Sequence, residues 1–597
     1  MAFWKSNRRR IGLLGLGLGL VGLCVVVLTP KPDPAPQAIE PTPADVSALH
    51  TLDARVRAAT RTVSSAVVAV AGNGPEPDPA PCPPQGYASG VIISADGLVL
   101  SQFHVSHRYE FRGDPGEQER SRRPGERTTV ILHDGRVVPA ELLGADPAFD
   151  LSLLRLLEPG PYPHAPVEPR AEVALGDWVL KFGHPTGYRR DRGAVVRLGR
   201  VVSKEGSLFV TDCHITGGDS GGPFFDLEGR LVGIPGDSQV PPALNNTGLA
   251  LPPQLYNCLS SSPIREFVPR MLRAEMTAAG RSAKAERIRQ LAQTRNILPT
   301  DRWTQGVETA SAFRDVVGPA AAHVVEIRDA SDRPVAAGTV VGADGWILTV
   351  ASLVPAEPRC RLPDQRVVPA KVVRVNRPFD LALLKVAEPN LSPVEWARDQ
   401  PGTRVGTLLA APSATPTPDR PLLGVGIVSV PTRDLPGPFP EQREHARIRA
   451  DAPGLFGTPT DRGFRLDTID ASIAGDVHVG DMLVAIGEKP VRSQDDVRSA
   501  ADGRRPGDRV VAHLSRNGRP VDVSIELRAK PITWTKPYGN LPTLFEHDMP
   551  LPPDRCGGTV IDLNGKAVGV TVFRGKYGCL AVPAECVERV LPEMKAH

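Results

Sequence analysis

A serine flanked by glycines is the segment of this chain best suited to chemistry. The segment runs from Gly217 to Pro223 with the sequence GGDSGGP, and an apolar run follows it. A serine hydroxyl is a weak nucleophile near neutral pH, so it needs a base beside it and donors for the developing oxyanion. The glycines allow a tight turn that exposes Ser220 and directs the N–H groups of Gly218 and Ser220 to one point. The pattern indicates a nucleophile with its oxyanion hole, although it is also common in ordinary turns.

Two residues upstream provide the partners that such a serine needs. His104 follows two predicted strands joined by an Asp-Gly turn, and Asp150 stands at the start of a predicted buried strand, residues 151–154. The order His, Asp, Ser, with each residue at a strand end, is the arrangement of chymotrypsin-like double barrels. Taken singly, His104 could be a strand-end histidine and Asp150 a capping residue. Together with Ser220 they predict a catalytic triad.

With these motifs the chain resembles the HtrA/Deg family of trypsin-like serine proteases over residues 60–260. The segments on either side of the serine, 211–216 and 248–252, are also similar to that family. The resemblance implies that His104 is the general base, that Asp150 orients it and that Ser220 attacks a peptide carbonyl. We therefore expect an acyl-enzyme mechanism on polypeptide substrates, with no cofactor and no metal. A homo-oligomer, for which trimers are the family expectation, is a further implication.

The composition favours an exported β protein and gives no sign of a nucleic-acid partner. The chain has 597 residues, enough for three or four domains, and its 62 prolines and 57 glycines fit a loop-rich fold. Lys and Arg number 70 against 67 Asp and Glu, so no bulk positive field favours nucleic acid. Outside the first 28 residues the cysteine count is odd and the spacing matches no metal site, so we assign no disulfide pairing.

The N-terminus predicts a membrane anchor. Residues 11–28 carry no charge and are preceded by Lys5 and three arginines, so the run is just long enough to span a bilayer with residues 1–10 in the cytoplasm. A cleavable signal peptide is the alternative. The run ends without a small-x-small cleavage site, which favours an uncleaved, single-pass anchor. The bulk of the chain is then extracytoplasmic, periplasmic in a bacterium, and begins with a Pro-rich linker at 29–58.

The chain repeats itself, and the second copy lacks the triad. Residues 90–100 align with 338–348, 149–154 with 379–384, and 207–234 with 543–570, where ten of 28 positions are identical. The alignment places Ser352 at His104, keeps Asp380 at Asp150, and places Cys556 at Ser220. A thiol could attack in principle, but Ser352 cannot act as a general base near neutral pH. We interpret the second copy as a pseudoprotease.

An insertion separates the halves of the second copy. The alignment offset rises from 230 to 336 within it. This difference of 106 residues is about the length of one small domain, and residues 463–491 resemble a PDZ domain. Within the insertion, the segment Leu455, Phe456, Gly457 and Thr458 resembles the loop that binds a peptide carboxylate through backbone N–H groups. A groove blocked by the surrounding barrel is an equally weighted alternative. In the HtrA family the PDZ domain usually follows the barrel instead.

The predicted fold is mainly β, with two chymotrypsin-like double β-barrels, the second degenerate, an inserted PDZ domain and an N-terminal transmembrane helix. The predicted function is a membrane-tethered serine endopeptidase for unfolded or damaged proteins. One alternative is a latent scaffold that captures partners through its pseudoprotease and PDZ domains, and another is a processing protease for one partner. The expected segments are a basic tail 1–10, an anchor 11–28, a linker 29–58, a protease domain 59–260, a helical connector 261–304, a degenerate domain 305–438 and 531–597, and a PDZ domain 439–530.

Overall fold

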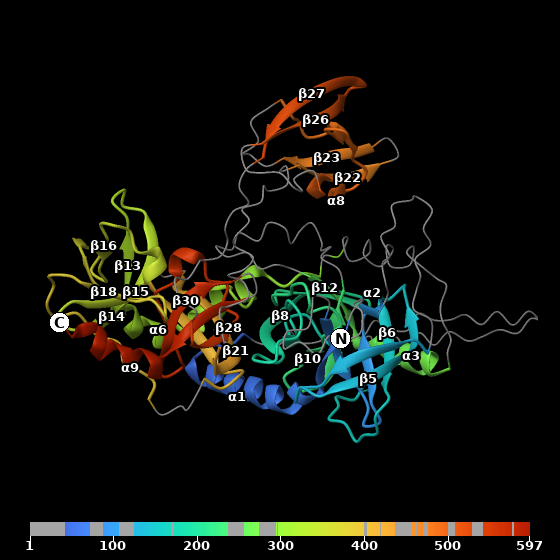
Figure 1. Ribbon diagram of the computed structural model, residues 1–597, viewed down its shortest axis with the longest axis horizontal. Coiled ribbons are helices and arrows are strands. Elements are labelled where there is room, and N and C mark those ends of the chain that lie inside the picture. Colours follow the sequence, from blue (N-terminus) through green and yellow to red (C-terminus); the bar gives the residue numbers. More distant parts are fainter. Residues whose placement is uncertain are drawn as a thin grey trace, which may run out of the picture. The chain divides into compact units, whose positions relative to one another are not determined.

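The computed structural model describes most of the chain after residue 41, and its elements are labelled in Figure 1. The anchor predicted at 11–28 and the first part of the Pro-rich linker lie outside the described residues. Among the described residues, no helix has both the length and the apolar character needed to cross a membrane. The described residues are 42–71, 87–106, 125–168, 172–236, 256–273, 294, 296–398, 403–417, 420–435, 455–460, 463–469, 476–499, 508–527, 541–575 and 578–596.

The first repeat, defined as strands β1 to β12, forms two closed antiparallel barrels. Their strand orders are β1-β2-β3-β6-β5-β4 and β10-β11-β12-β9-β8-β7. The first barrel comprises β1 (Val67–Ala71), β2 (Tyr87–Ile92), β3 (Leu98–Ser101), β4 (Arg127–Ile131), β5 (Val137–Asp146) and β6 (Leu151–Leu156). The second comprises β7 (Trp178–Gly183), β8 (Val195–Glu205), β9 (Leu208–Thr211), β10 (Phe224–Phe225), β11 (Leu231–Pro235) and β12 (Tyr256–Ser260).

The predicted hairpin before His104 is present, and its turn explains the Asp-Gly pair. Gly97 has φ +89°, a left-handed conformation that costs glycine nothing, and the N–H of Leu98 donates to Ser94 Oγ over 3.0 Å. Beyond the turn Ile92 pairs with Val99 and Val91 with Leu100. The hairpin therefore delivers the chain from β3 directly to His104.

The second repeat, defined as β13 to β21 with β28 to β31, has one open sheet and one closed barrel. The strand equivalent to β5 is interrupted at Ala370, whose N–H donates to the Pro358 carbonyl over 2.9 Å and continues the pairing of residues 367–369 with residues 359–361. The open sheet, in the order β17-β16-β13-β14-β15-β19-β18, contains β13 (Val324–Arg328), β14 (Pro334–Gly342), β15 (Trp346–Val350), β16 (Arg359–Arg361), β17 (Val367–Pro369), β18 (Lys371–Asn376) and β19 (Leu381–Lys385). The barrel, in the order β20-β21-β28-β31-β30-β29, contains β20 (Leu408–Thr417), β21 (Arg420–Asp434), β28 (Thr543–His547), β29 (Thr559–Ile561), β30 (Ala567–Arg574) and β31 (Cys579–Pro583).

The insertion forms a separate sheet with a core of its own. Its order is β22-β23-β24-β26-β27, with β25 paired to β24. The elements are β22 (Leu455–Thr460), β23 (Gly463–Ile469), β24 (Met482–Ile486), β25 (Lys489–Pro490), α8 (Gln494–Ser499), β26 (Arg509–Arg516) and β27 (Arg519–Glu526). Its buried cluster includes Leu455, Phe464, Leu483 and Val497, and all of its members among the described residues belong to the insertion.

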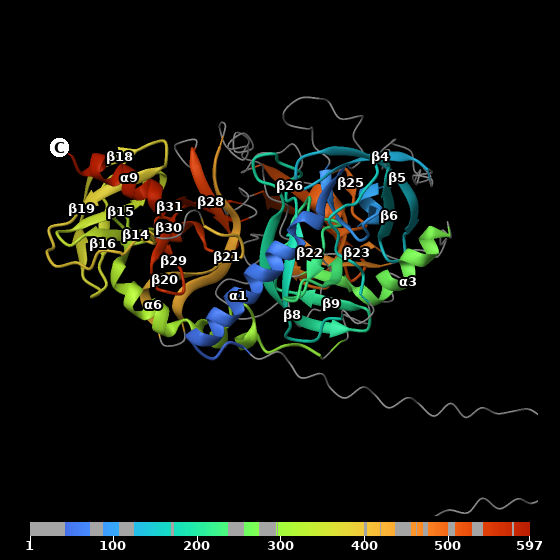
Figure 2. The ribbon, with the colours of Figure 1, turned by 90° about the horizontal axis from the view of Figure 1, so that it is seen from below.

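A long helix occupies part of the expected linker, which corrects that prediction. Helix α1 (Val46–Val63) begins at Asp45, whose side chain accepts a hydrogen bond from the N–H of Ala48. The prolines of the preceding residues obscured the amphipathic spacing that follows them. One face of the helix is buried, through Leu49, Leu52, Val56, Ala59 and Val63. The same helix contacts both repeats, since Arg55 pairs with Glu228 and Asp53 accepts the N–H of Leu408 (Figure 2).

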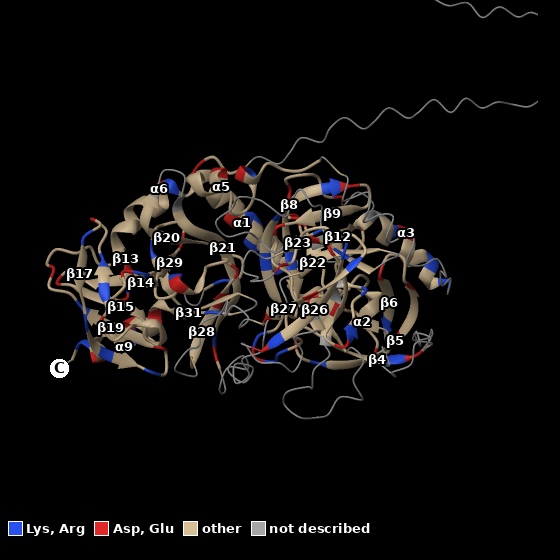
Figure 3. Cartoon of the chain, turned by 90° about the horizontal axis from the view of Figure 1, so that it is seen from above, with Lys and Arg blue, Asp and Glu red and all other residues tan. Residues whose placement is uncertain are grey.

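One buried hydrophobic cluster joins the two repeats, and each repeat also has clusters of its own. A single buried cluster includes Leu198 of β8 and Ile427 of β21, together with Trp303 from the segment between the repeats. That segment was predicted to be a helical connector, and its described part contains α3 (Ser261–Leu272) and a short 3-10 turn. Basic and acidic residues are interspersed along the described elements (Figure 3). The other helices are α2 (Phe103–Ser106), α5 (Val307–Ala312), α6 (Arg314–Ala320) and α9 (Ala584–Lys595), with 3-10 turns at Ser64–Ala66, Thr300–Arg302, Ala321–His323, Ala351–Leu353 and Pro553–Arg555.

Candidate active site

His104 and Asp150 lie in direct contact in the first repeat. The one-turn helix α2 carries His104 just past β3, and Asp150 directly precedes β6 with φ +56°. The Asp150 carboxylate accepts the backbone N–H of His104 at Oδ1 over 3.0 Å, and its Oδ2 lies 2.8 Å from the ring Nδ1. The Asp150 side chain is only 11% exposed, against 39% for His104. A carboxylate at Nδ1 favours the tautomer that leaves Nε2 as a proton acceptor.

The loop that carries Ser220 is held against β2 by backbone contacts. The N–H of Ser89 donates to the Ser220 carbonyl over 2.8 Å, and Ser89 Oγ donates to the Gly218 carbonyl over 2.8 Å. Gly218 has φ +95°, and a Cβ at Gly221 would lie 2.2 Å from the Ser89 carbonyl oxygen. The turn therefore requires glycine at both positions. Ser220 itself is half-buried.

Gln102 joins the Asp150 carboxylate to the serine loop, a role that sequence reasoning missed. Its Nε2 donates to Asp150 Oδ2 over 2.9 Å and to the Pro235 carbonyl over 2.8 Å. Its Oε1 accepts the N–H of Gly221 over 2.7 Å. The only signal in the sequence was a polar residue at the end of an apolar strand, two positions before His104.

The predicted site residues thus differ in how closely the structure joins them. His104 and Asp150 share two hydrogen bonds, whereas Ser220 is tied to Asp150 through Gln102 and Gly221. No hydrogen bond joins the His104 ring to the Ser220 hydroxyl within the described contacts. The N–H groups of Gly218 and Ser220 donate to no group in the described part of the chain. Two donors in this turn are therefore available for an oxyanion.

A buried ionic cluster lies directly beneath the serine loop. Asp219, the neighbour of Ser220, pairs with Arg197 of β8 at 2.9 Å, and both side chains are fully buried. The buried amine of Lys181 donates to the Asp219 carbonyl over 3.1 Å. Burial lowers the pKa of Lys181 to about 8. Burial alone would raise the pKa of Asp219, but the charges of Arg197 and Lys181 leave it below its usual value.

The second repeat reproduces the frame of this site with different chemistry. The N–H of Ser352 donates to Asp380 Oδ1 over 2.8 Å, and the Ser352 hydroxyl donates to Oδ2 over 2.7 Å. Asp380 has φ +54°, almost the value of Asp150. The N–H of Ala337 donates to the carbonyl of the buried Cys556 over 2.8 Å, as Ser89 does to Ser220. Ser352 therefore occupies the contacts of the histidine but offers no basic nitrogen.

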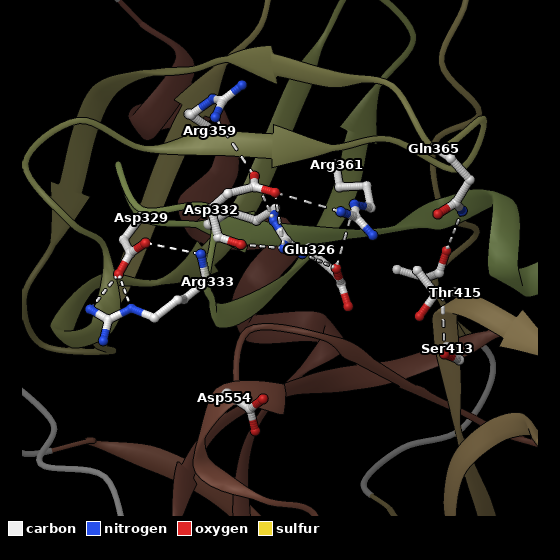
Figure 4. A network of polar contacts seen from close by, with 12 residues as sticks. Glu326, Asp329, Asp332, Arg333, Arg359, Arg361, Gln365, Ser413, Thr415 and Asp554 are labelled. Atoms are coloured by element: carbon white, nitrogen blue, oxygen red, sulfur yellow. Dashed lines mark hydrogen bonds and ion pairs between the residues drawn. The ribbon is translucent and has the colours of Figure 1, made fainter.

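The ionic cluster has no counterpart in the second repeat. The matching ladders of the two barrels place Ala411 at the position of Lys181 and Gly424 at that of Arg197. Arg555 stands at the position of Asp219 and pairs instead with Glu326 at 2.9 Å. Glu326 in turn lies in a network with arginines of β13 and β16 and with Asp332 (Figure 4). The second repeat therefore has neither a histidine at the position of His104 nor the charges that lie beneath Ser220 in the first repeat.

Comparison with known proteins identifies the fold of both repeats. A family model for the trypsin-like peptidase domain matches residues 88–234 and again residues 336–459. A protein of Bartonella henselae described as "Probable periplasmic serine endoprotease DegP-like" is 30% identical over 176 residues, 28% of this chain and 31% of the relative. Another of that description, from Ectopseudomonas mendocina, is 36% identical over 154 residues, 25% of this chain and 29% of the relative.

The chain has an HtrA/Deg-like trypsin fold. Each match covers less than a third of the length of these DegP-like relatives. The crystal structure of the serine endoprotease from Yersinia pestis aligns with 80% of this chain and 98% of that chain, at 16% identity and a TM-score of 0.28.

The segment expected to bind a peptide carboxylate lies in a strand of the insertion. Leu455, Phe456, Gly457 and Thr458 all lie in β22 and pair with β23. Leu455 is buried and Phe456 is 48% exposed, so these two neighbouring side chains lie on opposite faces of the sheet. The residues before Leu455, where a binding loop would begin, lie outside the described part.

Proposed function

We propose that the first repeat is a serine endopeptidase with His104, Asp150 and Ser220 as its triad. The observation that carries the proposal is the Asp150 carboxylate, which holds His104 Nδ1 and is tied through Gln102 to the loop of Ser220. This arrangement supports His104 Nε2 as the acceptor of the serine proton. The match to serine endoproteases supports the same reaction.

In the proposed mechanism Ser220 Oγ attacks the carbonyl carbon of a peptide bond while His104 Nε2 takes its proton. The N–H groups of Gly218 and Ser220 stabilise the oxyanion of the tetrahedral intermediate. The protonated His104 then donates its proton to the leaving amine, and an acyl-enzyme on Ser220 remains. Asp150 stabilises the imidazolium during both steps. A water molecule then attacks the acyl carbonyl while His104 Nε2 takes its proton. His104 returns this proton to Ser220 Oγ as the bond between the acyl group and the serine breaks.

We assign the substrates to unfolded or damaged polypeptides outside the cytoplasm, and the residues 11–28 to a membrane anchor. The periplasmic relatives support the compartment. We propose a protease domain at 59–260, a degenerate domain at 305–438 and 531–597, and a PDZ domain at 439–530. For the last, β22 supports peptide capture, because it is an edge strand of its sheet and packs against α8. An edge strand offers backbone groups to an added peptide strand.

Cleavage of casein by the full chain tests the proposal. We expect wild type to degrade casein and Ser220→Ala to leave it intact while remaining folded. Cys556→Ala is the matched control, since it changes the equivalent residue of the second repeat, where Ser352 supplies no base. A latent scaffold predicts no cleavage by any of the three proteins. A processing protease predicts an intact casein despite a reactive Ser220, which a fluorophosphonate probe detects.

A further inference from the structure

The second repeat reaches into the first at the strand that carries Arg197. Strands β8 and β21 pack together, and Asp548, just after β28, lies where they meet. Asp548 Oδ2 accepts the N–H of Leu198 in β8 over 2.8 Å, and Oδ1 accepts the N–H of Ile427 in β21 over 2.6 Å. One carboxylate therefore fixes strands from both repeats to each other.

Internal comparison shows which half of this contact belongs to the repeat and which is special to the interface. Asp212 is the equivalent of Asp548 in the first repeat. Its Oδ1 accepts the N–H of Arg200 in its own barrel over 2.6 Å, and its Oδ2 accepts that of Thr304 over 2.7 Å. In both repeats, then, Oδ1 of this aspartate accepts a backbone N–H from a strand of its own barrel. Only Asp548 uses its second oxygen on the other repeat.

The bond from Asp548 fixes β8 at the residue next to Arg197. The guanidinium of Arg197 pairs with Asp219, and Asp219 directly precedes Ser220. Both charges are fully buried, so a shift of the strand that separates them weakens an ion pair that solvent cannot replace. The position of β8 is in this way coupled to the conformation of the serine turn.

A second route runs through Arg433, near the end of β21. Its guanidinium pairs with Glu546 and lies 3.7 Å from Asp191 of the first repeat. Asp191 begins a chain of contacts toward the serine turn. Its neighbour Arg192 donates to the Pro185 and Gly187 carbonyls, and the N–H of Thr186 donates to the Gly217 carbonyl over 2.8 Å.

The turn formed by residues 185–192 also limits where Gly218 can lie. A Cβ on Gly218 would come within 2.3 Å of the His184 carbonyl oxygen and 2.8 Å of the Thr186 nitrogen. The backbone of the proposed oxyanion donor is thus packed directly on this turn, and Arg433 lies 3.7 Å from Asp191 of the same turn. A movement of the second repeat would therefore change the position of the Gly218 backbone.

We infer that the second repeat is a positioning element for the Ser220 loop, acting through Asp548 on β8 and through Arg433 on the 185–192 turn. The inference rests on the proposed function of Ser220 for its kinetic consequences, but not for its structural ones. It gives the degenerate repeat a role that requires neither a base nor a nucleophile of its own. Asp548 and Arg433 are positioning residues, since neither contacts Ser220.

The kinetic test uses Asp548→Asn and Arg433→Met in the full chain, with Asp562→Asn as the matched control. Asp562 belongs to the same barrel and accepts the N–H groups of Asn564 and Lys566 within its own turn, so its loss destabilises the second repeat alone. We expect Asp548→Asn and Arg433→Met each to lower kcat and the rate of fluorophosphonate labelling about tenfold or more, with KM changed less than about twofold. Asp562→Asn should lower Tm but retain kcat, and Arg433→Lys should recover part of the loss.

Hydrogen exchange provides a readout that does not depend on activity. Amide exchange over residues 214–222 should become about tenfold faster in Asp548→Asn and Arg433→Met than in Asp562→Asn, because the loop loses its support. If Asp548→Asn does not fold, the inference is tested by comparing the exchange rates and kcat of Arg433→Met with those of Arg433→Lys. Exchange and kcat that match the control in the folded variants overturn the inference. Unlabelled wild type with faster exchange in the variants contradicts the proposed function and leaves the inference supported.

Discussion

Arg197 Nη1 lies 2.9 Å from Asp219 Oδ2, one residue before Ser220, and neither side chain is exposed to solvent. Removing one member of a buried ion pair leaves an uncompensated charge, which costs far more than the net value of the pair. The position equivalent to Asp219 in the second repeat carries Arg555, and Gly424 replaces Arg197. The pair is therefore present only in the repeat that also has the histidine and the serine.

Arg197→Met should reduce fluorophosphonate labelling strongly and destabilise the protein by about 3–5 kcal/mol, because Asp219 is left charged and buried. The matched control is Arg230→Met. Arg230 pairs with Asp226 at 2.6 Å but is 40% exposed, so its loss should cost less than about 1 kcal/mol and leave labelling unchanged. Labelling rate and urea unfolding measure both effects. Equal behaviour of the two variants would show that the buried pair has no special role.

Gln102 should prove sensitive to charge more than to size. Gln102→Met removes its hydrogen bonds to Asp150 and Gly221, and we expect kcat to fall about tenfold. Gln102→Glu places a second carboxylate against Asp150 Oδ2, where like charges repel, and should cost about a hundredfold or more. Steady-state kinetics of the two purified variants, with Tm as a folding check, gives the order. If Gln102→Glu were more active than Gln102→Met, the side chain of Gln102 would not join Asp150 to the serine loop in the way we propose.

Restoring the two missing triad residues should not activate the second repeat. In a Ser220→Ala background, Ser352→His with Cys556→Ser rebuilds the histidine and the serine beside Asp380. We expect no labelling by a fluorophosphonate, because Ala411, Gly424 and Arg555 still replace the buried cluster beneath the loop. Mass spectrometry of the labelled peptide locates any adduct. An adduct on residue 556 would mean that the cluster is dispensable.

Two buried histidines should make the fold less stable in weak acid. Burial lowers the pKa of His184 and of His547 to about 3, so both stay neutral in the fold while the unfolded chain protonates them below its value of 6.5. The folded-state pKa values are depressed, so their contribution is complete above pH 6.5 and is lost as pH falls toward 3. Between these two pKa values, each histidine lowers the free energy of unfolding by about 1.4 kcal/mol for each unit by which the pH falls. Burial raises the pKa of Asp548 to about 6, which acts in the opposite direction below that pH.

Urea unfolding of wild type and His547→Leu between pH 7 and pH 5 isolates one histidine from these opposing effects. The difference in unfolding free energy between the two proteins should shrink by about 1.4 kcal/mol for each pH unit below 6.5. A difference that is constant with pH would show that His547 is protonated in the fold or exposed.

The insertion should be removable without loss of the first repeat's chemistry. Asp434 of β21 pairs with Thr543 of β28, so the ends that flank the insertion lie opposite each other in a ladder. The inserted sheet has its own core. Replacing residues 441–530 with a short Gly-Ser linker should therefore keep Tm and Ser220 labelling near wild type, and remove binding of peptides with an apolar C-terminus. A deletion that does not fold would mean that the insertion completes the barrel.

The strands and their repeat could be predicted because their signals are local. The hairpin around Gly97 and its copy around Gly345 combine alternating apolar residues with a turn that needs φ near +90°. Helix α1 was missed because the prolines before Asp45 dominated the composition of the segment.

The candidate site was only partly predictable, for a physical reason. His104, Asp150 and Ser220 belong to motifs with characteristic neighbours, so sequence alone brings them together. Arg197 and Lys181 are polar residues within largely apolar strands, and Gln102 directly follows such a strand; in a sequence these residues resemble the exposed face of a sheet. Their partners are distant in the chain, as Arg197 and Asp219 are, so only the folded arrangement reveals that they are buried and paired.

The central claim is tested most directly by mapping the site of fluorophosphonate modification in the full chain. Wild type and Cys556→Ala should each carry one adduct, found by mass spectrometry on the peptide that contains Ser220. His104→Ala should react several orders of magnitude more slowly, and Ser220→Ala should not react. Absence of any adduct from folded wild type, or an adduct that persists in Ser220→Ala, would contradict the account.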